Sequence, residues 1–211
     1  MTRPVPTIVC HFTDEANLPG IVANGLLADT AVGDNLQREA GKPGIKERRR
    51  ERAVPVGRYQ GFVGDYVPFY FAPRSPMMYV ISRGQVPEYG SDLASLVYLV
   101  SSVEQLFDLG HEPVFTRRNA VLANADFTND VGVLDDHIDW PLMDAHMWND
   151  TDEDTDRKAR RMAECLVHGR VDWAAFHEIG VFDDAARTRV ARTLTTLNAE
   201  TPVVVHRDWY Y

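Results

Sequence analysis

The sequence predicts a mixed α/β fold in a single domain. Short apolar runs rich in β-branched and aromatic residues alternate with segments of helical periodicity along the chain. The 211 residues are 45% hydrophobic and 25% charged, an ordinary globular composition that can bury a substantial core. The chain contains no internal repeat and no low-complexity tract. We therefore expect one domain over residues 1–211.

The N-terminal half alternates strand and helix signals. A strand over Thr7–Cys10 ends in the polar groups of His11-Phe12-Thr13. A helix that Asn17 can cap follows, with Pro19 in its first turn, and Gly25 closes it before the strand-like Leu26-Leu27. We expect a basic helix over Ile45–Arg52 and a strand over Tyr66–Phe71, which Pro73 and Pro76 end in a rigid turn.

The C-terminal half continues the alternation. The expected strands are Leu96–Ser101, Pro113–Thr116, a strand from near Glu164 through Val167, Ile179–Phe182 and Pro202–His206. The expected helices are Val103–Leu109, Asp156–Met162 and Asp183–Asn198, and Trp140–Trp148 is expected to be irregular or helical.

Charge and cysteine usage narrow the functional classes. A net charge of −9 argues against a general nucleic-acid binder, yet a local basic patch runs from Lys42 to Arg58. The acidic run from Asp126 to Asp156 is expected to be a solvated face. Cys10 and Cys165 lack metal-site spacing and are expected to be buried small hydrophobes. No apolar run approaches membrane-spanning length and residues 1–6 lack the regions of a secretory signal, so a cytoplasmic protein without membrane contact is expected.

Two segments carry candidate chemistry. Residues 65–79, DYVPFYFAPRSPMMY, combine aromatics, prolines and the single cation Arg74 in a way that suits the wall of a site. Glu164 lies in the apolar run Ala163–Val167, where a carboxylate is costly unless it has a partner or a function. The competing interpretation of Glu164 is a structural ion pair with Arg160 or Arg161.

Six short motifs occur in one order from about Cys10 to Tyr211. They are His11-Phe12-Thr13, Asn17-Leu18 with Gly20-Ile21, the basic helix Ile45–Arg52, the segment YVPFYFAPRSPMMY, Ala163-Glu164 with Leu166-Val167, and Asp208-Trp209-Tyr210-Tyr211. Together they resemble the DarT family of DNA ADP-ribosyltransferases, toxins that are paired with a macrodomain antitoxin. The resemblance implies the split two-sheet core of ADP-ribosyltransferases, with NAD in the cleft between the sheets.

The resemblance also implies the catalytic pair. Glu164 matches the family's catalytic glutamate, and a carboxylate there would accept a hydrogen bond from a ribose hydroxyl and stabilise the oxocarbenium-like sugar. Arg49 matches the catalytic arginine, with Arg48 and Arg50 as neighbours that the helix could present instead. Because a guanidinium stays charged, Arg49 is expected to bind the NAD pyrophosphate and to stabilise charge on the acceptor base.

The remaining NAD contacts follow from the same resemblance. His11 and Thr13 would hold the nicotinamide ribose and amide, with the Phe12 backbone available to the amide. Gly20 and Leu27 would contribute backbone or shape. About residues 33–52 would cover the cofactor, with Gly33, Gly41 and Gly44 giving freedom to close. NAD is expected as a substrate, and no metal is expected.

The family acceptor is a base in single-stranded DNA. Thymine is the first choice, and guanine, which related enzymes modify, is the alternative. Candidate stacking groups are Tyr59, Tyr66, Phe69 and Tyr79, near the cation Arg74. The loop region of about residues 116–164 would face the substrate, where Asn119 could read a base edge or serve as a structural loop residue. The expected partners are single-stranded DNA and the macrodomain antitoxin, an ADP-ribosylglycohydrolase.

Two other functional classes stay open. A metal-dependent nuclease would use the acidic and histidine residues Asp135, Asp136, His137, Asp139, Asp144 and His146, whose spacing matches no strong metal motif. A catalytically silent nucleic-acid-binding module would tolerate loss of Glu164. Activity in EDTA tests the first class, and NAD turnover tests the second.

Overall fold

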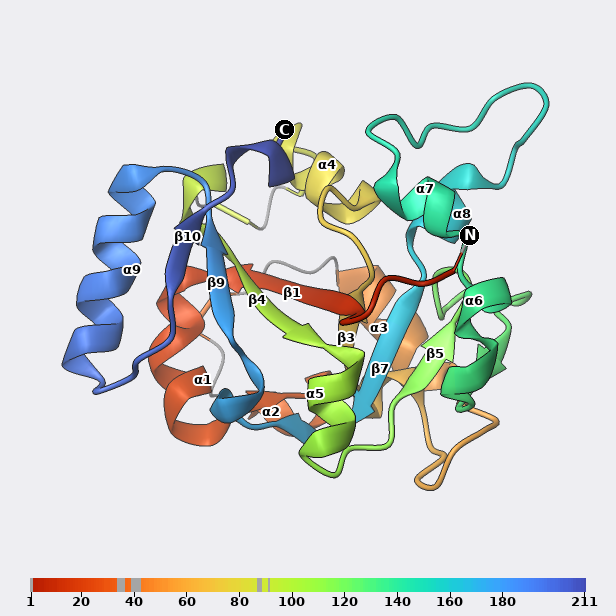
Figure 1. Ribbon diagram of the computed structural model, residues 1–211, viewed down its shortest axis with the longest axis horizontal. Coiled ribbons are helices and arrows are strands. Elements are labelled where there is room, and N and C mark those ends of the chain that lie inside the picture. Colours follow the sequence, from red (N-terminus) through yellow and green to blue (C-terminus); the bar gives the residue numbers. More distant parts are fainter. Residues whose placement is uncertain (1, 34–36, 39–42, 87–88, 91) are drawn as a thin grey trace.

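The computed structural model describes residues 2–33, 37–38, 43–86, 89–90 and 92–211 (Figure 1). The strands are β1 (Ile8–Asp14), β2 (Leu26–Leu27), β3 (Tyr66–Tyr70), β4 (Leu96–Ser102), β5 (Val114–Thr116), β6 (Phe127–Thr128), β7 (Glu164–His168), β8 (Arg170–Val171), β9 (Glu178–Val181) and β10 (Val203–Val205). The helices are α1 (Leu18–Asn24), α2 (Asp29–Val32), α3 (Pro43–Glu51), α4 (Pro76–Ser82), α5 (Val103–Asp108), α6 (Leu134–His137), α7 (Trp140–Asp144), α8 (Arg157–Arg161) and α9 (Asp184–Thr196).

One mixed sheet organises the fold. In the described part of the chain, eight strands follow the order β10-β9-β4-β1-β3-β7-β5-β6, and β2 pairs with β8 in a separate ribbon. Strand β1 pairs with β4 along its whole length, from Ile8↔Ser102 to Asp14↔Leu96. Against β3, by contrast, β1 pairs at Cys10↔Tyr70 alone among the described residues. The sheet therefore consists of two halves joined at one point, which confirms the expected mixed α/β class and its split core.

Pro68 explains why the two halves separate. The His11 ring nitrogen Nδ1 lies 2.8 Å from the Pro68 carbonyl oxygen, so the backbone of Pro68 faces β1. In a strand, the N–H and C=O of one residue point to the same side, and the proline nitrogen carries no hydrogen. The β1–β3 register would place Phe12 opposite Pro68, where the ladder has no donor. The two strands therefore diverge beyond Cys10 and Tyr70.

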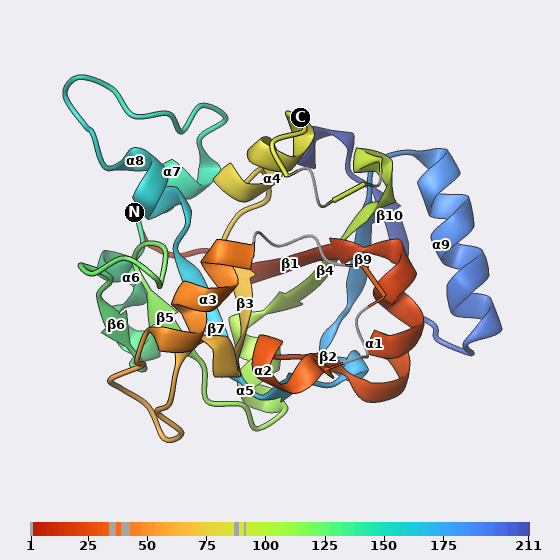
Figure 2. The ribbon, with the colours of Figure 1, turned by 180° about the vertical axis from the view of Figure 1, so that it is seen from behind.

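The helices cover both sides of this sheet. Figures 1 and 2 show α5 on one side and α3 on the other, lying over β3 and β7. Polar caps start several helices: Ser75 accepts from the Met78 N–H at α4, and Asp183 accepts from the Ala186 N–H at α9. Gly25 ends α1 at φ +79°, where a Cβ would meet the Val171 carbonyl oxygen at 2.8 Å.

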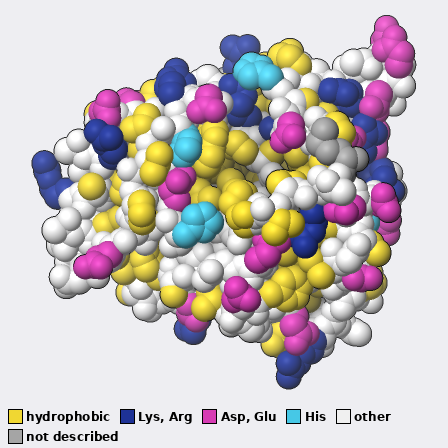
Figure 3. Space-filling model, in the orientation of Figure 1, with side chains coloured by type: hydrophobic (Ala, Val, Ile, Leu, Met, Phe, Trp, Pro, Cys, Tyr) yellow, Lys and Arg dark blue, Asp and Glu magenta, His cyan; other side chains and the backbone are white. Residues whose placement is uncertain are grey.

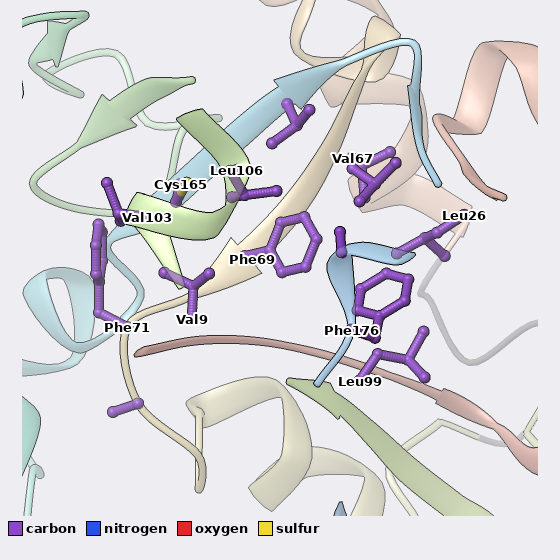
Figure 4. Packing of buried hydrophobic residues seen from close by; sticks show 14 of the residues in the cluster. Val9, Leu26, Val67, Phe69, Phe71, Leu99, Val103, Leu106, Cys165 and Phe176 are labelled. Carbon is purple, nitrogen blue, oxygen red and sulfur yellow. The ribbon is translucent and has the colours of Figure 1, made fainter. Parts of the chain in front are cut away.

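The core fills the space between the strands and the helices. Val67 and Phe69 of β3 point into it together with Val9, Leu99 and Phe176 (Figure 4). Cys10 and Cys165 are buried free thiols, as expected from the sequence. Burial raises the pKa of the Cys10 thiol to about 12, so it behaves as an apolar side chain at neutral pH.

Several predicted elements differ in their details. Strand β1 runs on to Asp14 rather than ending at Cys10, because residues 11–14 remain paired with β4. Residues 76–82 form the helix α4, where the sequence predicted only a rigid turn at Pro73 and Pro76, and Ser75 followed by Pro76 is its N-terminal signal. Asn17 occupies the N-cap position of α1, but its side chain makes no capping bond.

Part of the acidic run lies on the surface, as the sequence predicted. The loop between α7 and α8 projects from the body, and acidic side chains line its outer edge (Figures 1 and 3). Asp150, Asp152 and Glu153 are exposed there, so this part of the acidic run is a solvated face. Over the described ranges, no helix is both long and apolar enough to cross a bilayer. The expected hinge residue Gly41 and the cation Lys42 lie outside the described residues.

Candidate active site between the two half-sheets

A cavity of about 210 Å³ opens where β1 and β3 separate. Its walls come from β1, α1, β2, α2, α3, β3 and α4, with further residues from loops. The lining residues are His11, Phe12, Thr13, Asn17, Gly20, Ile21, Gly25, Leu26, Leu27, Asp29, Val32, Arg38, Ile45, Lys46, Arg49, Tyr66, Pro68, Tyr70, Met77, Asn119 and Met162. All of the residues predicted from the sequence for NAD binding are in this set.

Three consecutive residues of β1 form one wall. The carbonyl oxygen of Pro68 can only accept, so His11 donates from Nδ1, which fixes the ring in the gap between β1 and β3. The Thr13 hydroxyl accepts from the Asn17 side-chain amide at 3.0 Å. The Phe12 backbone faces the position where Pro68 offers no N–H, so its own amide group is presented to the cavity.

Alternate residues of β3 form the facing wall. Tyr66, Pro68 and Tyr70 line the cavity, whereas Val67 and Phe69 point into the core, as the two-residue period of a strand requires. Burial raises the pKa of the Tyr70 hydroxyl, and the negative charge of Glu164 raises it further against a smaller opposing effect of Arg49. Tyr70 is therefore a neutral hydroxyl beside the acidic residue.

Glu164 begins β7, is 0% exposed and is not among the residues that line the cavity, but its neighbours Arg49 and Tyr70 are. The strand register places it between Tyr70 of β3 and Thr116 of β5. One carboxylate oxygen accepts from Arg49 Nη1 at 2.8 Å, and the other accepts from the Ala120 backbone N–H at 2.9 Å. A buried carboxylate is stable only with such partners.

The alternative partners of Glu164 are engaged elsewhere. Arg160 pairs with Asp139 and Asp154. Arg161 donates to backbone carbonyls, including those of Leu142 and Pro73. The structural interpretation, in which Glu164 pairs with Arg160 or Arg161, is therefore wrong for this fold.

Helix α3 presents Arg49 rather than its neighbours. Arg48 is exposed, and Arg50 donates to Asp29 at 2.7 Å on the outer side. Arg49 is 9% exposed, and its Nη2 is buried without a hydrogen-bond partner among the described residues. An unsatisfied buried guanidinium nitrogen at a cavity suits an anionic or carbonyl-bearing ligand.

Asp29 holds α3 in place beside the cavity. Its carboxylate lies 2.6 Å from Lys46 Nζ and 2.7 Å from Arg50 Nε, one turn apart on either side of Arg49. Burial raises the pKa of Asp29, but the hydrogen bonds and charges of Lys46 and Arg50 outweigh it, so the pKa lies below its ordinary value. This clamp fixes the helix that carries Arg49.

Two of the candidate DNA-binding residues reach the cavity. Asn119 lines it, with its side-chain oxygen accepting from the Val121 N–H at 3.0 Å and its amide nitrogen 3.6 Å from the Met162 sulfur. Tyr66 also lines the cavity and donates its hydroxyl to the Gln60 carbonyl.

The other four candidates lie away from the cavity. Phe69 is 0% exposed in the core, which leaves it no face for a base. Tyr59 stacks on His168 at 4.4 Å between ring centroids. Arg74 donates to the Tyr210 carbonyl oxygen and lies over the Tyr211 ring, and Tyr79 packs edge-on against that same ring, so both secure residues 210–211.

The segment 65–79, predicted as a site wall, does supply Tyr66, Pro68, Tyr70 and Met77 to the cavity, but sequence reasoning did not single out the following cavity residues individually. Tyr70 could have been found from the alternation of Tyr66, Pro68 and Tyr70. Arg38 and Lys46 are cations in the expected covering segment, but position alone does not distinguish them from exposed cations. Met77 lies on α4, so its place depends on a helix that was not expected.

The acidic residues considered for a metal are dispersed. Across the described residues, no group of three or more His, Cys, Asp or Glu side chains is arranged to hold a metal ion. Asp139 caps α7 through the Leu142 N–H and pairs with Arg160, so it stabilises local structure. His137 is half-buried, and burial lowers its pKa.

A sheet divided by a cleft, with a buried glutamate beside a cavity-lining arginine, is the arrangement that the resemblance to ADP-ribosyltransferases implied. The family model described as "ssDNA thymidine ADP-ribosyltransferase, DarT" matches residues 10–211. The chain belongs to the DarT family of DNA ADP-ribosyltransferases, as the sequence motifs indicated.

Known proteins similar to this chain extend over its full length. It is 36% identical to a DNA ADP-ribosyl transferase of Thermus sp. strain 2.9, with 100% of this chain and 99% of the relative covered. A solved structure of Thermus sp. 2.9 DarT with ADP-ribosylated single-stranded DNA superposes at a TM-score of 0.92, covering 100% and 99% of the two chains at 36% identity. A second, with NAD⁺, gives 0.89 at 34% identity and covers 100% of both chains.

Proposed function

We propose that this protein, acting as one domain, transfers ADP-ribose from NAD to thymine in single-stranded DNA. The bond between nicotinamide and the ribose C1 breaks, and C1 forms a new bond to a ring nitrogen of the base. Nicotinamide leaves with the bonding electrons, and the base nitrogen releases its proton. The buried pair of Glu164 and Arg49, of which Arg49 lines the cavity, carries this proposal.

Glu164 stabilises the sugar as the glycosidic bond breaks. Its carboxylate is held by the Arg49 guanidinium and the Ala120 N–H, so its direction is fixed before substrate binds. Each carboxylate oxygen can accept more than one hydrogen bond, so the contact with Arg49 leaves capacity for a ribose hydroxyl. In other enzymes, removing one preorganised electrostatic group from a site without water lowers kcat by about 10²–10³-fold.

Arg49 stabilises negative charge rather than accepting a proton. Its unpartnered Nη2 is available to the NAD pyrophosphate or to the oxygens of a base that is losing its proton. The guanidinium remains protonated in proteins, so the proton of the base leaves by another acceptor or solvent. Solved structures of one relative, with NAD⁺ and with ADP-ribosylated single-stranded DNA, support a protein that takes both ligands.

The nicotinamide half of NAD belongs between the half-sheets. His11 and Thr13 contact its ribose and amide, and the Phe12 backbone offers the amide the hydrogen bonds that β3 does not use. Gly20 and Leu27 close the apolar side of the pocket. NAD acts as a substrate, and the site needs no metal.

The acceptor base enters from the side of Asn119, in the substrate-facing region of about residues 116–164. Asn119 and Tyr66 are the residues of this proposal that contact the base, because both line the cavity. We further propose that the protein acts in the cytoplasm, where NAD and DNA occur together. There it works as the toxin of a pair whose macrodomain antitoxin, an ADP-ribosylglycohydrolase, removes the modification.

The test uses NAD and short single-stranded oligonucleotides that differ in one base, with EDTA present. Mass spectrometry should find one ADP-ribose on the thymine oligonucleotide, with nicotinamide released in equal amount. Glu164→Gln should lose about 10²–10³ of this rate. The exposed Glu112→Gln is the matched control and should keep the wild-type rate.

Each other outcome identifies a different function. Modification of the guanine oligonucleotide alone would show that the acceptor is guanine rather than thymine. DNA cleavage that EDTA abolishes would indicate a nuclease. DNA binding without any NAD consumption would indicate a silent binding module and overturn the proposal.

A further inference from the structure

Asn17 uses its side chain to hold a second segment of the cavity wall. It is 3% exposed, and its amide makes four hydrogen bonds. Its oxygen accepts from the backbone N–H of Gln37 and from that of Arg38, each at 2.9 Å. Its nitrogen donates to the Arg38 carbonyl at 2.8 Å and to the Thr13 hydroxyl at 3.0 Å.

These four hydrogen bonds use both N–H groups of the amide and both lone pairs of its oxygen. Two donors and two acceptors meet one side chain, so aspartate would lose both donated bonds and alanine all four. Because the backbone N–H and C=O of Arg38 both bind the same side chain, its backbone is fixed relative to β1 and α1. The direction in which its side chain leaves the backbone is fixed with it, and Arg38 lines the cavity.

The charge of the cavity suits a diphosphate. Arg38, Lys46 and Arg49 line it together with Asp29, whose carboxylate is already engaged by Lys46 and Arg50. Among the described lining residues, three cations therefore face one carboxylate, that of Asp29. A guanidinium matches two phosphate oxygens at once, which a point charge such as lysine does not.

We propose that Asn17 is a positioning residue that holds Arg38 against the cavity, and that Arg38 binds the diphosphate of the dinucleotide. This inference rests on the proposed function, because the dinucleotide is NAD. Of the two roles proposed above for Arg49, this inference keeps the one at the reacting end beside Glu164 and assigns the diphosphate to Arg38.

Calorimetric titration with NAD and with ADP tests the inference without requiring catalysis. Arg38→Ala and Asn17→Ala should each weaken both ligands by about 10-fold to 100-fold, the range expected for lost charge-assisted hydrogen bonds. Arg38→Lys should recover part of the loss. The double variant should bind no more weakly than Arg38→Ala, because Asn17 acts through Arg38. In steady-state assays with DNA, Arg38→Ala should raise KM for NAD and leave kcat within about 2-fold.

Controls distinguish this role from a structural one. Asn24→Ala on the same helix and Arg48→Ala on α3 are exposed and should bind as wild type does. Arg38 is exposed, so Arg38→Ala should keep the wild-type Tm even if Asn17→Ala lowers it. Equal NAD affinity in Arg38→Ala and wild type, or additive losses in the double variant, would overturn the inference while the proposed function stands. No NAD binding by the wild type would remove both.

Discussion

Breaking the buried pair between Arg49 and Glu164 should destabilise the protein measurably. The side chains are 11% and 0% exposed, so solvent screens the pair little. Removing one partner of a buried ion pair costs about 3–5 kcal/mol. Because Arg49 lines the cavity, truncating it brings the open cavity next to Glu164 and lowers the cost, so we expect the lower end, about 3 kcal/mol. For a protein of this size, that corresponds to a loss of about 6–12 °C in Tm.

The complementary change has a different origin. Glu164→Gln replaces one acceptor oxygen by an NH₂ group, which must then face either the Arg49 guanidinium or the Ala120 N–H. Two donors that face each other leave one group unsatisfied, at about 1–3 kcal/mol. In Arg49→Ala/Glu164→Gln the amide can turn its oxygen to Ala120 and its NH₂ to the cavity. The double variant should therefore be about 2 kcal/mol more stable than the sum of the single losses predicts.

Urea and thermal unfolding of the four proteins measure this cycle. Arg48→Ala, one residue along the same helix but exposed, should change the free energy of unfolding by less than about 0.5 kcal/mol. If the losses of the two single variants add within about 0.5 kcal/mol, the contact contributes no coupling, and the preorganised pair described above would be refuted.

Two further predictions concern titrating groups. The pKa of Asp29 is lowered in the folded state, so its contribution to stability is present above its ordinary pKa of 3.8 and is lost as the pH falls through and below that value. Asp29→Asn should therefore lower Tm most at neutral pH and progressively less as the pH falls below 3.8, and a loss that does not change with pH would contradict the clamp. The Cys10 thiol has a pKa raised to about 12, so native protein should react slowly with iodoacetamide at about pH 8, whereas urea-unfolded protein should react at both cysteines. Rapid labelling of native Cys10 would contradict its burial.

Much of the site could be predicted because its chemistry is local in sequence. Glu164 was identifiable as a carboxylate in an apolar run, because burying an unpaired carboxylate costs free energy in any fold. His11–Thr13 were identifiable at a strand that turns polar. The choice of Arg49 over Arg48 and Arg50 needed the family motif, because each of three consecutive arginines can face inward depending on where the helix begins.

The remaining features depend on contacts between distant residues. Phe69 was expected to stack on a base, but the alternation of β3 assigns it to the core and Tyr70 to the cavity. Asn17 has the sequence position of a helix cap, and its side chain instead binds residues 37–38. A propensity for capping describes the local backbone and carries no information about a segment 20 residues away.

The proline in β3 has a consequence for how the family can diverge. The inner edge of β1 at Phe12 offers an N–H and a C=O, which every residue except proline carries. A ligand bound there is held by the chain itself, so the side chain at position 12 can change while the groups offered to the ligand stay the same. Position 68 has the opposite property, because any other amino acid would restore an N–H and allow β1 and β3 to pair further. The residue at position 68 therefore decides whether the edge of β3 offers β1 a donor opposite Phe12, without any change in the residues of the other cavity walls.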